Sequence, residues 1–101
     1  MLRPSLQDAL RDRDAVLRAF LAPDGSLRSI PTKIRKSLVV LDLLAQQFEP
    51  GEKYEETAVN NLLRHFHDDV AALRRYLVEE GFLDRADGHY WRAGGSVPER
   101  I

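Results

Sequence analysis

Residues 52–92 read EKYEETAVNNLLRHFHDDVAALRRYLVEEGFLDRADGHYWR, and this stretch decides the fold. It predicts a minimal strand at Lys53-Tyr54, then two helices on a tight turn near His67, and finally a hairpin. The hairpin turn is predicted at Asp87-Gly88, because that dipeptide readily adopts the left-handed backbone of a two-residue turn. This order indicates a winged helix-turn-helix, an α+β fold that presents one helix and one hairpin to a nucleic-acid duplex.

A long apolar helix is predicted before this stretch, from Thr32 as its N-cap to about Phe48. Apolar residues occupy two of its faces, and Val39, Val40 and Leu43 form the second one. A helix that is apolar on two faces is normally buried on both. We therefore expect the N-terminal helix of the chain, or a second subunit in a homodimer, to cover the second face.

The N-terminal part is predicted as one amphipathic helix over roughly residues 6–21, capped by Ser5. Turn residues at positions 22–26 end it. The predicted organisation is an N-terminal helix and linker over residues 1–24, a winged-helix domain over residues 25–92 and a flexible C-terminal tail over residues 93–101.

Length and composition limit the function classes. A chain of 101 residues with 44% hydrophobic content fits one globular domain. The chain has no cysteine, which excludes disulfides, thiolate metal sites and a cysteine nucleophile. Its first residues break into charges without a signal-peptide core, and no stretch is apolar enough to span a membrane. We expect a cytoplasmic location and no membrane partner.

Positive charge is concentrated rather than general. The net charge is −1, whereas nucleic-acid-binding domains are commonly basic overall. Residues 27–36, however, contain two arginines and two lysines and no acid, which gives +4. Such a patch attracts phosphate, and we expect it to form one strip with the basic residues of the last helix and hairpin. The residues predicted to bind nucleic acid are Lys33, Lys36, Arg75, Tyr76, Arg85 and Arg92.

Each part of this predicted site has a structural alternative. Arg75 and Tyr76 are the candidates for base edges, and the lysines and arginines are the candidates for phosphates. The outer face of the same helix also carries acids such as Glu79, which repel phosphate, so a solvated helix face is the competing interpretation. Arg85 and Arg92 on the hairpin are also typical of residues that keep an edge strand soluble.

Three other residues of the same region are predicted to be structural. Arg74 lies close to the core-facing side of its helix, so we expect a buried stem and a head paired with an acid. Tyr90 and Trp91 alternate on the second hairpin strand, so one is expected to close the core and the other to be half exposed.

Metal and enzyme chemistry have weak support. His65, His67 and Asp69 are able to ligate a divalent metal if the turn brings them together. Side chains of this kind at a helix boundary more often cap the helix or brace the turn, so no metal or other cofactor is predicted. The sequence has no Gly-rich phosphate loop, no G-x-S-x-G elbow and no HExxH, so no enzyme is predicted.

Two stretches carry a family resemblance: IPTKIRKSLVVLDLLAQQFEPGEKYEETAVNNLL over residues 30–63, and FHDDVAALRRYLVEEGFLDRADGHYWR over residues 66–92. Matching elements include the Pro-x-Lys-x-x-Lys approach to the long helix, the Phe-Glu-Pro-Gly turn and the Gly-x-Tyr-Trp-Arg hairpin. The pattern resembles the bacterial family called domain of unknown function 2087 over about residues 25–92. The members of that family are small bacterial proteins or C-terminal parts of regulators with a separate helix-turn-helix domain.

The resemblance implies a setting in transcription regulation without an established activity. The motif positions, which transfer no role, are Pro31, Lys33, Lys36, His67, Asp69, Arg74, Arg75, Tyr90 and Arg92. Together with the fold, it predicts a nucleic-acid-binding transcriptional regulator, or a regulator-associated winged-helix module, with double-stranded DNA as its partner. The alternative is a protein-interaction or dimerisation module that has the same fold and binds no DNA.

Overall fold

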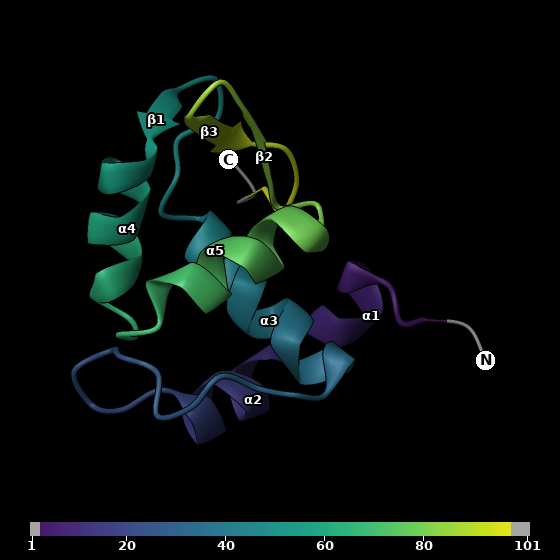
Figure 1. Ribbon diagram of the computed structural model, residues 1–101. Helices are drawn as coiled ribbons and strands as arrows, with labels where there is room; N and C mark the ends of the chain where they lie inside the picture. The colour runs from purple at the N-terminus through teal and green to yellow at the C-terminus, as the bar shows by residue number, and fades with distance from the viewer. Residues whose placement is uncertain (1–2, 98–101) are drawn as a thin grey trace.

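The computed structural model describes residues 3–97, which form five helices and a three-stranded antiparallel sheet (Figure 1). The helices are α1 Leu6–Leu10, α2 Arg13–Phe20, α3 Ile34–Ala45, α4 Glu56–Arg64 and α5 Val70–Glu79. The strands are β1 Lys53–Glu55, β2 Leu83–Ala86 and β3 His89–Arg92, and their order in the sheet is β1-β3-β2. The predicted α+β class is confirmed. None of these helices has the length and apolar character needed to cross a bilayer.

The central helix α3 is buried on both of its apolar faces. Helices α1, α2 and α5 all pack against it (Figure 1). Val39 and Val40, on the predicted second face, are each 1% exposed, and Leu43 is half-buried. They join one hydrophobic core with residues of α1 and α2 such as Ala9 and Val16. The N-terminal helices of the chain therefore cover this face, and its burial requires no second subunit.

The N-terminal helix predicted over residues 6–21 is interrupted between α1 and α2. Its start is as predicted, because the Ser5 hydroxyl accepts a hydrogen bond from the backbone N–H of Asp8. At the interruption, the Arg35 guanidinium of α3 donates to the carbonyl of Asp8 (2.7 Å) and to the carboxylate of Asp12 (3.0 Å). This tertiary contact holds the break, which local helix propensity alone does not predict.

Local signals set the end of α5 and the hairpin turn. Gly81 follows α5 with a φ of +79°, and the N–H of Phe82 donates to the carbonyl of Leu77 (2.8 Å). This bond, which spans five residues, closes the C-terminal cap of the helix. Asp87 and Gly88 have φ values of +53° and +77°, as the predicted two-residue turn requires.

A buried polar cluster fastens the segment after β3 to α3. Asp42 is 3% exposed, and its carboxylate accepts hydrogen bonds from the backbone N–H (2.6 Å) and the hydroxyl (2.7 Å) of Ser96. The side chains of Gln46 and Arg92 both donate to the carbonyl of Ser96. A buried carboxylate requires partners of this kind, because isolation from water is costly. The cluster therefore fixes the course of the chain beyond β3.

The tail predicted over residues 93–101 therefore begins with an anchored segment. Gly94 lies so close to the backbone of Gly81 that an added Cβ would come within 2.6 Å of the Gly81 carbonyl oxygen. Any larger residue would force the two segments apart. The remaining residues of the predicted tail, 98–101, lie outside the described residues.

We expect Asp42→Ala to lower the free energy of unfolding by about 2 kcal/mol, because it leaves the partly buried N–H and hydroxyl of Ser96 without their acceptor. Denaturation in urea, extrapolated to zero denaturant, measures this change. Asp14→Ala is the control, since the Asp14 side chain on α2 is 86% exposed, and surface changes usually stay within about 0.5 kcal/mol. Equal stability of the two variants would contradict the role given to Asp42.

Candidate nucleic-acid interface

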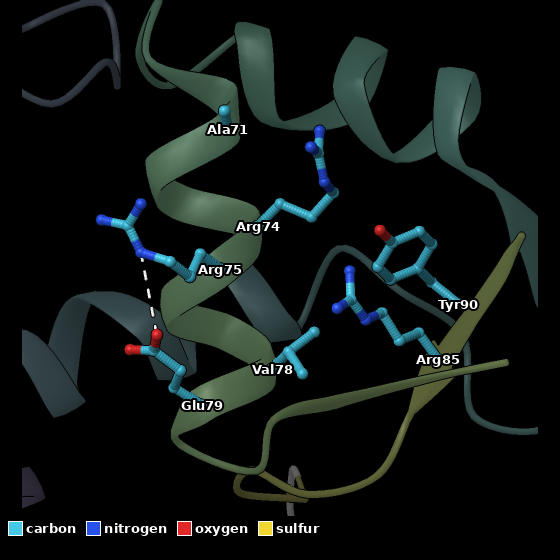
Figure 2. A pocket seen from close by; sticks show the side chains of 7 residues that line it. All are labelled: Ala71, Arg74, Arg75, Val78, Glu79, Arg85 and Tyr90. Atoms are coloured by element: carbon cyan, nitrogen blue, oxygen red, sulfur yellow. Dashed lines mark ion pairs between the residues drawn. The ribbon is translucent and has the colours of Figure 1, made fainter.

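A groove of about 460 Å³ lies between α5 and the β2–β3 hairpin (Figure 2). Its lining consists of Ala71, Arg74, Arg75, Val78 and Glu79 of α5, Arg85 of β2 and Tyr90 of β3. In Figure 2, the side chains of Arg74, Arg85 and Tyr90 lie on the hairpin side of α5. Arg75 and Glu79 extend from the opposite side of the helix. The groove is thus rich in guanidinium groups, but their surroundings differ.

Arg74 is held by neighbouring side chains. Its Nε lies 3.6 Å from the Glu56 carboxylate, and its Nη1 donates to the amide oxygen of Asn60. The Tyr90 hydroxyl donates to the same Glu56 oxygen at 2.8 Å. The Arg74 side chain is only 21% exposed, so the predicted buried stem and paired head are confirmed. Arg74 therefore links α5, α4 and β3.

Arg75 is exposed and loosely paired. Its Nε lies 3.7 Å from a carboxylate oxygen of Glu79, four residues later on α5, and the two side chains are 59% and 58% exposed. The Arg75 guanidinium also lies over the ring of Tyr76, 5.0 Å from the ring centroid. Water screens an exposed pair of this type, so it contributes at most about 1 kcal/mol. Arg75 is therefore accessible to an external anion.

Arg85 has no carboxylate partner in the described part of the chain. Its partner in the antiparallel register is Tyr90 on β3, and both residues line the groove. Within residues 3–97, no acidic oxygen lies within 4.0 Å of the Arg85 guanidinium. Its charge is therefore the groove's clearest attraction for an anion.

Lys33 and Lys36 lie elsewhere. They line a separate hollow of about 350 Å³ together with Phe20, Ile30 and neighbouring residues, and this hollow shares no lining residue with the groove. Arg35, from the same basic window, pairs with Asp12 and braces the N-terminal helices. Of the six predicted binding residues, Arg75 and Arg85 line the groove, although the Arg75 side chain extends from the side of α5 opposite the hairpin.

The other two predicted binding residues have structural contacts. The Arg92 guanidinium donates to the carbonyls of Gly94 (3.0 Å) and Ser96 (2.5 Å), so it anchors the C-terminal segment. Tyr76 is half-buried beneath Arg75 and packs against the core.

His67 and Asp69 stabilise the turn between α4 and α5 through hydrogen bonds to the backbone. The Asp69 carboxylate accepts a hydrogen bond from the N–H of Ala72 (3.1 Å) and caps α5. The ring Nδ1 of His67 accepts one from the N–H of Asp69 (3.0 Å). In the described part of the chain, no three potential metal ligands, His65 included, are grouped to hold an ion.

The aromatic pair divides as predicted. Tyr90 is 2% exposed and belongs to the core. Trp91 is half-buried on the other face of the sheet, where the Lys53 ammonium lies 5.9 Å from its ring centroid. Sequence reasoning did not identify Glu56 or Asn60, because their partners are on other elements and nothing in the local pattern indicates them.

A family model described as "Uncharacterized protein conserved in bacteria (DUF2087)" matches residues 26–92. The chain belongs to this family. The predicted resemblance is confirmed, and the matched DUF2087 region runs from before α3 to the end of β3, so it contains the whole groove. Helices α1 and α2, which cover α3, precede it. No curated protein and no solved structure matches the chain significantly.

We expect Tyr90→Phe to lower the melting temperature by about 4–8 °C, because a lost partly buried hydrogen bond is worth about 1 kcal/mol in a domain of this size. Thermal denaturation followed by circular dichroism measures the shift. Tyr76→Phe is the matched control, since the Tyr76 hydroxyl makes no hydrogen bond within residues 3–97. A Tyr90→Phe protein as stable as this control would contradict the role given to the hydrogen bond between Tyr90 and Glu56.

Proposed function

We propose that the chain is a winged-helix module of transcription regulation that binds the phosphate backbone of double-stranded DNA. The order α3, β1, α4, α5 and the β2–β3 hairpin supports this proposal, since it follows the helix, strand, helix-turn-helix and wing of that fold. Antiparallel pairing of β1 with β3 is consistent with a wing that continues a small sheet. In this proposal α5 is the recognition helix.

The observation that carries the proposal is the position of Arg85. It projects from the hairpin into the groove beside α5, without an acidic partner within residues 3–97. A guanidinium fork matches the geometry of phosphate oxygens and stays charged at all relevant pH values. Arg75 supplies a second accessible guanidinium, which extends from the other side of α5. Phosphate contacts of this kind position a protein on a duplex without reading its sequence.

The affinity expected from this site is modest and sensitive to salt. With two or three phosphate contacts, the binding constant is expected to fall about 10- to 40-fold between 50 and 200 mM salt, because each neutralised phosphate releases counterions. The net charge of −1 adds no long-range attraction from the rest of the molecule. Arg92 is left out of the proposed site, because its donors hold the C-terminal segment.

We expect Arg85→Ala to weaken DNA binding and to reduce the slope of log K against log salt by about one. Fluorescence anisotropy with a labelled 20-base-pair duplex, titrated at 50 to 200 mM salt, measures both. Arg13→Ala is the control, since it removes the same charge from α2, away from the groove. Undetectable DNA binding by the native protein at 50 mM salt, or equal effects of the two variants on DNA binding, would contradict the proposal.

The hollow lined by Lys33 and Lys36 favours one alternative function. Lys33 and Lys36 flank the partly buried apolar side chains of Phe20 and Ile30, a mixture suited to a protein partner with acidic and apolar groups. A protein-interaction module without DNA binding is therefore the competing function. Salt-insensitive binding to DNA, or none, would favour it.

A further inference from the structure

The three groove arginines differ in how their charges are compensated. Arg74 is paired with Glu56 and is mostly buried. Arg75 is paired with Glu79, and both of these residues line the groove. Arg85 has no acidic partner within residues 3–97. In Figure 2 Arg85 lies on the hairpin side of α5, whereas Arg75 and Glu79 extend from its opposite side. An anion on the hairpin side therefore meets the open cation, and one that also extends across α5 meets a cation that already has a carboxylate nearby.

Glu79 is poorly placed as a stabiliser of α5. It is the last residue of the helix, where the partial negative charge of the helix dipole disfavours a carboxylate. In its pair the basic residue comes first and the acid four residues later, which is the weaker of the two orientations. Both side chains are more than half exposed, so solvent screens their attraction. Helix stability thus gives little reason for an acid at this position.

We infer that Glu79 is an internal competitor for the anionic ligand of the groove, an inference that rests on the proposed function. In the free protein a carboxylate oxygen of Glu79 lies 3.7 Å from Nε of Arg75. A DNA phosphate that contacts Arg75 displaces Glu79, whose exposed side chain then turns into solvent. The acid therefore lowers the affinity of the site without taking part in the contact.

This competition selects the class of ligand. A single small anion at Arg75 only replaces the Glu79 carboxylate as the partner of the guanidinium, so it gains little binding free energy. A polyanion that also reaches Arg85 gains the interaction with the open guanidinium as well. The groove is therefore expected to favour a chain of phosphates over isolated phosphate ions, and to release weak anions that would otherwise occupy it.

We expect Glu79→Gln to tighten DNA binding about two- to fivefold, the range that an exposed ion pair supports. Glu80→Gln is the matched control. It removes the same charge from the adjacent residue, but Glu80 pairs with Arg3 and does not line the groove. Anisotropy titrations at 50 mM salt compare the two variants. A third comparison, Glu79→Gln in an Arg75→Ala background, is expected to show no tightening, because the competitor then has no guanidinium to occupy.

The outcomes separate this inference from the proposed function. Equal tightening by Glu79→Gln and Glu80→Gln would show a general charge effect and overturn the inference alone. Tightening that persists without Arg75 would show direct repulsion of phosphate and also overturn it. Absence of binding in the native protein and in Glu79→Gln alike would overturn the proposed function and the inference with it. Circular dichroism verifies that each variant is folded.

Discussion

The burial of α3 on both of its apolar faces is the constraint on which the rest of the structure depends. Its residues from Leu38 to Leu41, together with Leu44 and Ala45, are almost fully buried. Each large side chain of this kind contributes about 1.5–3 kcal/mol when it leaves water, so neither face is stable uncovered. The N-terminal helices cover one side and α5 lies on another. Asp42, the buried acid of α3, obtains its partners from the segment after β3.

The geometry of the groove depends on the contacts that α3 makes with its neighbours. Because α3 supports α5 and also holds the segment that follows β3, the hairpin has a defined position beside the helix. Arg92 is used to fix that segment, and Arg74 is used to join α5 to α4 and β3. Two arginines of the family region thus build the scaffold, whereas Arg75 and Arg85 project from it. For the proposed function, a scaffold with few accessible cations suits contact with the phosphate backbone of DNA better than reading of base edges.

The parts of the fold that the sequence predicted depend on local chemistry. Gly81 and Asp87-Gly88 act within a few residues of themselves, because backbone φ preferences fix a helix cap and a tight turn wherever they occur. The break between α1 and α2 depends instead on Arg35 reaching Asp12, 23 residues away. Asp42 is joined to the C-terminal segment across 54 residues. No periodicity or propensity specifies contacts of that separation, although an acid within an apolar helix could have signalled a buried partner.

The same distinction explains why residue type predicted the candidate site only in part. Arg74, Arg75, Arg85 and Arg92 carry the same charge, and on a helical wheel or a hairpin they differ only in direction. Their roles follow from the acceptors that the tertiary structure places beside them. A net charge near zero therefore says little about ligand binding here, since compensation is decided pair by pair. What remains for an external anion is a charge without a neighbouring carboxylate, and among residues 3–97 the groove arginine of this kind is Arg85.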